Sequence, residues 1–293
     1  MIKFEIPEPP YDRYSNRQLA AIPLAVLAVA LVIVGATWVF TGAPAAMGIE
    51  FTGGAELTIE TESDRSEIEA AFGEELDSIQ SVVGESNQFI LRFDSTDLDR
   101  LVTIANAELT PVGGADSIVE GERAVSPAFA DEQQHLALLA VVIAFLGMSL
   151  LAFVFFRSFI PSIAIVVSAF SDIMIPLAAM NLLDISLTMG TVAALLMLIG
   201  YSVDSDILLN NHILRRSGGF YESTYRAMQT GVTMTVTSMA AMFAMFVVAS
   251  IFGIEILAAI GLILFIGLAA DLMNTYLLNL SLLRWYKFEG VAR

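Results

Sequence analysis

Four aspartates lie within long apolar stretches of the sequence, where a charged side chain is rarely found: Asp172, Asp204, Asp206 and Asp271. A carboxylate at the centre of a membrane-spanning helix costs about 3 kcal/mol, so such a residue usually has a function. These stretches contain no lysine or arginine. A buried acid without a basic partner must be protonated, bind a cation, or face water or another subunit. This is the chemistry of an ion-coupled machine.

Asp204 and Asp206 cannot both take part in the same way, because they are only two residues apart. On a helix this spacing corresponds to a rotation of about 200°, so at most one of the two points into a bundle. Asp206 lies nearer the end of its apolar stretch and is expected to reach the membrane interface or a neighbouring helix. We therefore prefer Asp204 as the coupling residue.

Other polar side chains accompany these acids. A threonine row has the i, i+3, i+7 spacing that places its members on one helix face: Thr230, Thr233 and Thr237. Asparagines occur in the same stretches or at their ends: Asn210, Asn211, Asn274 and Asn279. They could line an ion path, or they could simply hydrogen-bond neighbouring helices. For Thr235 and Asn279 we favour the second interpretation.

The composition indicates a membrane protein. Hydrophobic residues make up 56% of the chain and charged residues 15%, against about 25% in soluble domains. The absence of cysteine excludes disulfides, thiolate catalysis and cysteine-type zinc sites. The two histidines, His135 and His212, are far apart in the sequence and form a poor metal site. We expect no metal, no cofactor and no enzymatic activity.

Six apolar stretches are long enough to cross a bilayer, which takes about 20 residues. They cover residues 19–40, 136–156, 160–183, 187–209, 232–252 and 256–283. The first is too long for a signal peptide and lacks a convincing cleavage pattern. The predicted organisation is an N-terminal segment (1–18), a first span (19–41), a loop domain (42–134), a five-helix bundle (135–284) and a C-terminal segment (285–293).

Lysine and arginine in the short connections predict the orientation. Basic residues lie before span one, between spans two and three, between spans four and five, and after span six. The connections around Asp184 and Glu255 carry none. Both termini are therefore expected in the cytoplasm, and the chain is expected in the plasma membrane as a multi-pass protein.

The loop domain, 42–134, is then extracytoplasmic and strongly acidic. It holds twenty acidic and four basic residues, against a net charge of −17 for the whole chain. Scattered acids suit a surface that must stay hydrated in concentrated salt, where repulsion is screened. The alternative is an acidic surface that binds a basic partner. We favour salt adaptation, because the acids are not gathered in one tail.

The pattern of this loop predicts a small α+β domain. Alternation over residues 50–61 indicates a strand, and a capping box at Asp64 and Glu67 opens a helix. Residues 78–83 and 88–93 are typical of a hairpin with its turn at 84–87. Ser95 could cap a second helix, and residues 117–125 form a last strand. The order βαββαβ is that of a ferredoxin-like fold, here a binding or lever domain.

Two motifs carry a resemblance to a known family along the whole chain. The first is a glycine signature after span one, whose key residues are Gly48, Phe51, Thr52, Gly53 and Gly54. The second is the sequence around Gly200, Tyr201 and Ser202 in span four. Together they resemble the SecF family of protein-export membrane proteins, whose signature reads G-I-D-F-T-G-G.

The resemblance implies a function and partners. Members of this family pair with SecD in a twelve-span assembly of the resistance-nodulation-division type. It would use the ion gradient to promote movement of unfolded secretory chains through the Sec channel. The expected partners are therefore a SecD-like protein, the channel, secretory chains and the lipid membrane, with no nucleic acid.

Two departures from the bacterial pattern concern the coupling site. Bacterial relatives carry the acid of span four at the position of Ser205, whereas SecD has a V-D-A-N pattern that matches Val203 and Asp204. An arginine of span five in bacterial relatives falls at Thr233, so the bacterial scheme does not transfer intact. With its acidic composition, the chain resembles a haloarchaeal member.

Two other classes of protein remain as alternatives. An ion-coupled small-molecule transporter of the resistance-nodulation-division type would also carry intramembrane acids, but would not need the glycine signature. An intramembrane aspartyl protease would need facing aspartates, which Asp172 and Asp204 could superficially provide. The residues before Asp204 do not form the motifs typical of such proteases.

Overall fold

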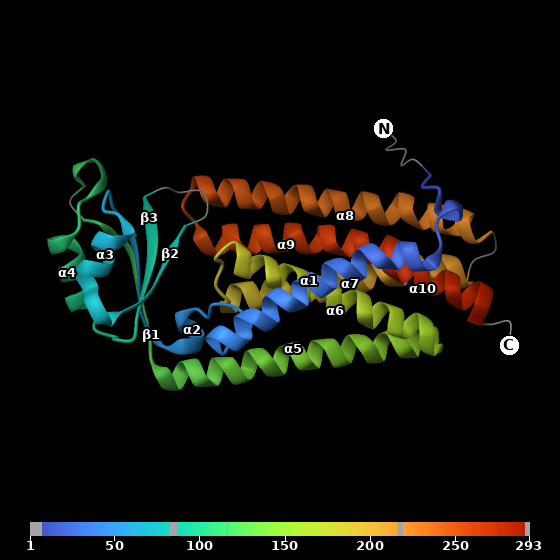
Figure 1. Ribbon diagram of the computed structural model, residues 1–293, viewed down its shortest axis with the longest axis horizontal. Coiled ribbons are helices and arrows are strands. Elements are labelled where there is room, and N and C mark those ends of the chain that lie inside the picture. Colours follow the sequence, from blue (N-terminus) through green and yellow to red (C-terminus); the bar gives the residue numbers. More distant parts are fainter. Residues whose placement is uncertain (1–7, 83–86, 116, 216–218, 291–293) are drawn as a thin grey trace.

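The computed structural model describes residues 8–82, 87–115, 117–215 and 219–290. It has two parts, an elongated bundle of long helices and a small α+β domain at one end (Figure 1). The start of the first long helix and the end of the last lie together at the opposite end of the bundle (Figure 1). The chain is thus a helical membrane protein with one small domain inserted between its first two spans.

Six helices are long and apolar enough to cross a membrane, which confirms the predicted number of spans. Five of them are single α-helices: α1 Asn16–Thr41, α5 Pro127–Phe156, α6 Phe159–Leu182, α7 Met189–Arg215 and α8 Phe220–Ile251. The sixth begins as α9 Glu255–Met273 and continues without a break through η4 Asn274–Asn279, α10 Leu280–Trp285 and η5 Tyr286–Gly290. The segments η4 and η5 are π-helical.

The second span begins earlier than its apolar residues suggest. The stretch predicted from residue 136 belongs to α5, which starts at Pro127 with Ser126 as its N-cap. Proline is favoured at the first helical position because its missing N–H would have no partner there. The loop domain therefore ends at β4, near residue 125, and not at residue 134.

The loop domain has the predicted βαββαβ order. Its elements are β1 Gly54–Glu60, α3 Arg65–Phe72, β2 Leu76–Ser81, β3 Gln88–Phe93, α4 Leu98–Glu108 and β4 Val119–Val125. The sheet is antiparallel with strand order β2-β3-β1-β4, which confirms the ferredoxin-like fold. The capping box of Asp64 and Glu67 at the start of α3 is also confirmed.

Two local predictions in this domain need correction, and a third lies mostly outside the described residues. Residues 49–52 form a short helix, α2 Ile49–Thr52, so the first strand begins at Gly54 and not at residue 50. The N-cap of α4 is Asp97, whose side chain accepts the Arg100 N–H, whereas Ser95 bonds to Asp97 itself. Of the expected hairpin turn at 84–87, residues 84–86 lie outside the described part of the chain.

The two faces of the sheet differ in chemistry. One face packs under α3 and α4 with apolar residues that include Leu57, Ile59, Leu91 and Phe93. The other face turns toward the bundle (Figure 1). Its side chains Glu56, Gln80 and Arg92 are polar yet buried. Buried polar groups need hydrogen-bond partners, so we expect this face to form hydrogen bonds with the segments that it contacts.

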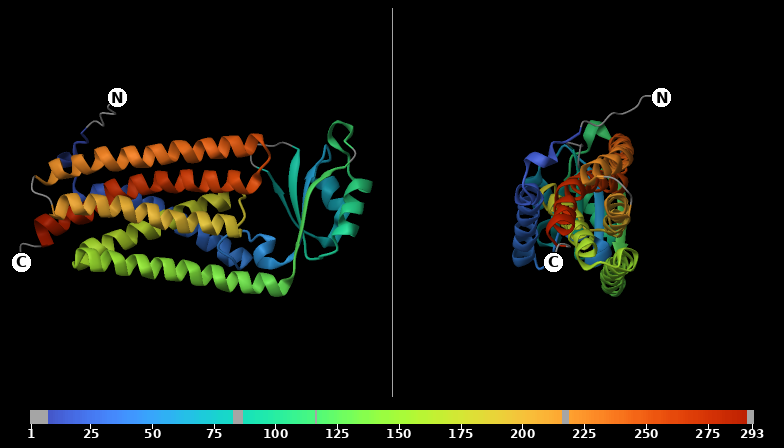
Figure 2. Two further views of the ribbon diagram at one scale, coloured as in Figure 1. Left: turned by 180° about the vertical axis from the view of Figure 1, so that it is seen from behind. Right: turned by 90° about the vertical axis from the view of Figure 1, so that its right-hand side faces the viewer.

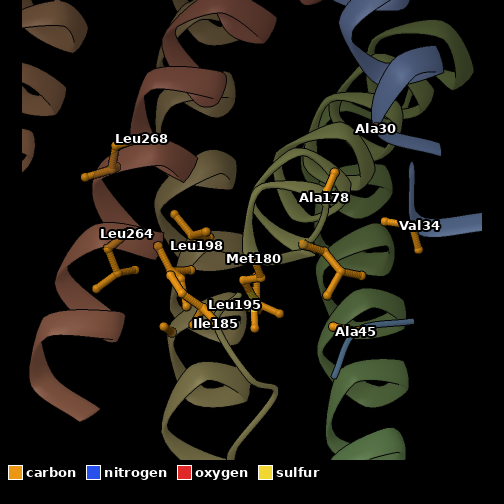
Figure 3. Packing of buried hydrophobic residues seen from close by; sticks show 13 residues of the cluster. Ala30, Val34, Ala45, Ala178, Met180, Ile185, Leu195, Leu198, Leu264 and Leu268 are labelled. Carbon is orange, nitrogen blue, oxygen red and sulfur yellow. The ribbon is translucent and has the colours of Figure 1, made fainter. Parts of the chain in front are cut away.

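In the bundle, α6 is the most buried span, whereas few residues of α5 and α8 are buried. Figure 2 shows the helices of the bundle running side by side, with the small domain beyond one end. Side chains of α1, α6, α7 and α9 interlock in the main apolar cluster, where Leu198 lies near Leu264 (Figure 3). At Gly261 of α9 a side chain would meet the backbone of α8, so these two helices approach closely.

Candidate functional site: a carboxylate cluster in the bundle

Three of the four intramembrane aspartates converge inside the bundle. Asp172 comes from α6, Asp206 from α7 and Asp271 from α9, and each is at most 2% exposed. Every one of them accepts hydrogen bonds from neutral hydroxyl or amide groups. Among the described residues, no salt bridge reaches any of the three. The site is therefore a cluster of acids with polar but uncharged partners.

Asp172 is held from two sides. Its Oδ2 accepts a hydrogen bond from the Ser202 hydroxyl of α7 at 2.6 Å. Its Oδ1 accepts one from the Asn274 amide of η4, also at 2.6 Å. Asp172 therefore joins α6 to both α7 and the last span.

Asp206 is bonded to the last span. Its Oδ1 accepts hydrogen bonds from the Thr275 hydroxyl at 2.9 Å and from the Asn279 amide at 2.7 Å. Its Oδ2 is buried and makes no described hydrogen bond, although the Ser168 hydroxyl lies close to this carboxylate. One oxygen of this carboxylate is therefore available for a proton or another ligand.

Asp206 and Asp271 share a hydroxyl group. The Thr275 hydroxyl lies 2.9 Å from Asp206 Oδ1 and 3.3 Å from Asp271 Oδ1. Ser205 donates to the same Asp271 oxygen at 2.8 Å and lies 3.2 Å from the Thr275 hydroxyl. A hydroxyl has one hydrogen, so Thr275 donates to only one carboxylate at a time. The arrangement allows a change at one acid to alter the bonding of the other.

The π-helix η4 brings the amide and hydroxyl donors to the acids. It spans Asn274–Asn279, and its residues Asn274, Thr275 and Asn279 all contact the cluster. π-Helical turns widen the spacing along a helix and often occur at functional sites. Asn279, which we expected only to join helices, is therefore a direct partner of Asp206, and Thr275 is a partner that was not predicted from the sequence.

The structure places Asp206, and not the preferred Asp204, inside the bundle. Asp204 lies on the exposed side of α7, whereas Asp206 is fully buried. The physical reason is that α7 packs inward on the face that carries Ser202, whose hydroxyl bonds to Asp172. Ser202, Asp206 and Asn210 follow one another at four-residue intervals, and all three are buried. This polar stripe was a signal in the sequence for the inward face.

The other candidates in spans four and five lie on the outer surface. Thr230, Thr233 and Thr237 share one face of α8, as predicted, but that face is exposed. The hydroxyls of Thr233 and Thr237 bond to carbonyl oxygens of their own helix. Gly200 and Tyr201 are exposed on α7. None of these side chains makes a described hydrogen bond to the carboxylate cluster, in contrast to Ser202.

The glycine signature lies away from the cluster, at the junction of the bundle and the loop domain. Phe51 is 2% exposed, and its carbonyl oxygen accepts the Gln134 side-chain amide of α5. The Thr52 hydroxyl bonds to backbone carbonyls of the signature itself. Gly53 and Gly54 have positive φ angles of 79° and 97°, and a Cβ on Gly54 would collide with the Phe93 carbonyl.

Within the described ranges, no group of three or more histidine, cysteine, aspartate or glutamate side chains could hold a metal ion. The cluster instead combines single carboxylates with hydroxyl and amide donors. Such a site can gain and lose protons or accept one small cation at the free oxygen of Asp206.

Comparisons with known proteins agree over the full chain. The family described as protein export membrane protein SecD/SecF, C-terminal, matches residues 105–289. The protein-export membrane proteins SecF of Haloferax volcanii and Haloquadratum walsbyi are each 58% identical to this chain, with all of both chains covered. SecF of Methanocaldococcus jannaschii is 37% identical, and the match covers 93% of this chain and 96% of that protein.

A solved structure shows the same fold. The crystal structure of SecDF from Thermus, described as a translocon-associated membrane protein, superposes with a TM-score of 0.74 at 21% identity. The match covers 96% of this chain and 39% of the SecDF chain, so this chain corresponds to less than half of that protein. On the full-length similarity to its curated relatives, the chain belongs to the SecF family of protein-export membrane proteins.

Proposed function

We propose that this chain works with a SecD-like membrane protein to use the ion gradient to promote movement of secreted proteins through the Sec channel. The family membership supports a role in protein export. The observation that carries the coupling to an ion is the buried cluster of Asp172, Asp206 and Asp271, which has no basic partner among the described residues. Acids in this setting are typical of ion-driven transport proteins.

The coupling step follows from the shared hydroxyls. A proton or cation that arrives at Asp206 removes its need for the Thr275 hydrogen, which can then turn toward Asp271. Because Asp206 is on α7 and Thr275 is on the last span, this exchange changes what holds the two helices together. A reversible change of helix packing is how such a site would drive a cycle.

The surface of α7 supports the need for a partner. Asp204 is exposed at a depth where contact with lipid would be costly. A Cβ added to Gly200, on the same exposed side, would have no atom within 4 Å, so another helix could approach closely there. The crystal structure of SecDF, of which this chain matches 39%, supports a SecD-like partner.

We propose the orientation with both termini in the cytoplasm and the acidic domain outside, on the distribution of basic residues. The chain has no cysteine, so a single cysteine can be introduced at Ser117 of the loop domain. This variant should react with a membrane-impermeant maleimide in intact cells. Reaction only after lysis would reverse the proposed orientation.

The proposed function is tested in membrane vesicles that contain the Sec channel, this chain and its SecD-like partner. Translocation of a secretory protein is measured with and without an imposed ion gradient. We expect the gradient to speed translocation only when both proteins are present. Equal gradient stimulation in vesicles without this chain would overturn the proposal.

A further inference from the structure

The glycine signature packs against the connection between α6 and α7. Gly48 N–H donates to the Leu187 carbonyl at 2.8 Å, and Leu187 N–H donates to the Ala46 carbonyl at 2.7 Å. A Cβ on Gly48 would lie 3.0 Å from Thr188 Cγ2, so a side chain there would disturb this contact. The segment that leads into the sheet is thus paired with the segment that leads into α7.

Glu50, the acid of the signature, bonds to both parts of the molecule. Its Oε2 accepts the backbone N–H of Met189, the first residue of α7, at 3.1 Å. Its Oε1 accepts a hydrogen bond from Arg123 Nη1 of β4 at 3.0 Å. The Glu50 side chain is only 16% exposed, so water competes weakly for these bonds. One carboxylate therefore ties the start of α7 to the far edge of the sheet.

A second tie connects the sheet to the end of α6. Gln80 of β2 donates to Asp184 Oδ1 at 3.2 Å and accepts from the Ser186 hydroxyl at 2.6 Å. Asp184 and Ser186 lie in the α6–α7 connection. Gln80 thus contacts the same connection as Glu50, but from the opposite edge of the sheet.

A series of hydrogen bonds and ion pairs connects Gln80 to Glu50 across the sheet. Arg92 of β3 bonds to Gln80 Oε1 at 2.8 Å and to Glu56 of β1 at 3.1 Å. Glu56 also pairs with Arg123, which completes the path back to Glu50. Burial alone would lower the pKa of Arg123, but the hydrogen bond and charge of Glu56, with those of Glu50, raise it overall. The guanidinium therefore stays charged.

We propose that Glu50 is a positioning residue that makes the sheet follow movements of α7. Asp206 lies 17 residues after Met189 on this one helix, or about 25 Å along its axis. A shift of α7 at the carboxylate cluster therefore reaches Glu50 through a rigid element, and Glu50 with Gln80 passes it to the sheet. The consequence for export rests on the proposed function, but the mechanical link does not.

The test uses pulsed electron paramagnetic resonance on the full chain with its partner. Spin labels are placed on cysteines at Thr103 of α4 and Val32 of α1, both exposed. We expect one narrow distance distribution in the parent protein and in Glu50→Asp, which keeps the charge. Glu50→Ala should broaden it, whereas Glu122→Ala, an exposed acid beside Arg123, should not. A distribution for Glu50→Ala as narrow as that of the parent would overturn the proposal.

Transmission is tested by adding Asp206→Asn, which imitates a neutral carboxylate. The distance between the labels should shift in the Glu50 protein. It should shift less in Glu50→Gln, which keeps an acceptor for Met189 but loses the charge, because only the Gln80 contacts then remain intact. No shift in the Glu50 protein, or an equal shift in both, would contradict the inference. The label distances are measured without protein export. If they behave as expected but the gradient does not stimulate translocation, the proposed function is refuted and the inference about Glu50 is retained.

Discussion

Replacing Arg92 by alanine should destabilise the loop domain strongly. The Arg92 side chain is 5% exposed and bonds to Glu56 and Gln80. Its loss leaves the buried Glu56 Oε2 without its donor, whereas Gln80 Oε1 keeps the Ser186 hydroxyl. Breaking a buried ion pair typically costs about 3–5 kcal/mol. Glu56 keeps its second partner, Arg123, which places the expected cost near the lower limit, about 3 kcal/mol.

The assay is hydrogen exchange of the strand amides in the full protein. A cost of about 3 kcal/mol corresponds to exchange roughly a hundredfold faster or more in β1 and β3, where exchange reports opening of the domain. Arg100→Ala is the matched control, because the Arg100–Glu75 pair is exposed at 58% and 37% and should contribute about 0–1 kcal/mol. Exchange no faster in Arg92→Ala than in Arg100→Ala would refute the reasoning.

Two further predictions concern packing and helix capping. Gly261→Ala should lower the melting temperature, because the new Cβ would lie 2.8 Å from Phe246 N and force α8 away from α9, at a cost of about 1–3 kcal/mol. Gly147→Ala, with no atom within 4 Å, should not lower it. Asp64→Ala should destabilise α3 at neutral pH. Hydrogen bonds from the Ser66 side chain and the Glu67 N–H lower the pKa of Asp64 below its ordinary value of 3.8. The stabilising effect of the Asp64 carboxylate is therefore fully present above pH 3.8 and is lost as the pH falls through the lowered pKa. In circular dichroism melts, the difference in melting temperature between the parent and Asp64→Ala should be smaller at pH 3 than at pH 7. An equal difference at both pH values would contradict this prediction.

The sequence predicts the spans and the loop domain well because both depend on local patterns. Apolar length alone identifies six spans. The capping box at Asp64 and the alternation of the strands are likewise local, and they give the βαββαβ order. The early start of α5 at Pro127 lies outside the apolar stretch, so hydropathy cannot find it, although the Ser126-Pro127 pair is a local signal.

The site is harder to predict because it depends on packing between helices. The spacing of Asp204 and Asp206 shows that they face opposite ways, but α6 and α9 decide which face is inward. The π-helix at Asn274–Asn279 has no residue pattern of its own in the sequence, yet it brings Thr275 and Asn279 to Asp206. Long-range partners of this kind appear only in the folded chain.

The most direct test of ion coupling compares Asp206→Asn with Asp204→Asn at matched protein levels. Asparagine keeps an acceptor for Thr275 and Asn279 but cannot change charge, so the helices should still pack. In vesicles with the SecD-like partner, we expect the ratio of translocation rates with and without the gradient to fall to about one in Asp206→Asn. Asp204→Asn keeps a polar side chain at the proposed partner surface of α7 and lies outside the buried cluster, so it should keep the parent ratio. Full gradient stimulation in Asp206→Asn would contradict the central claim.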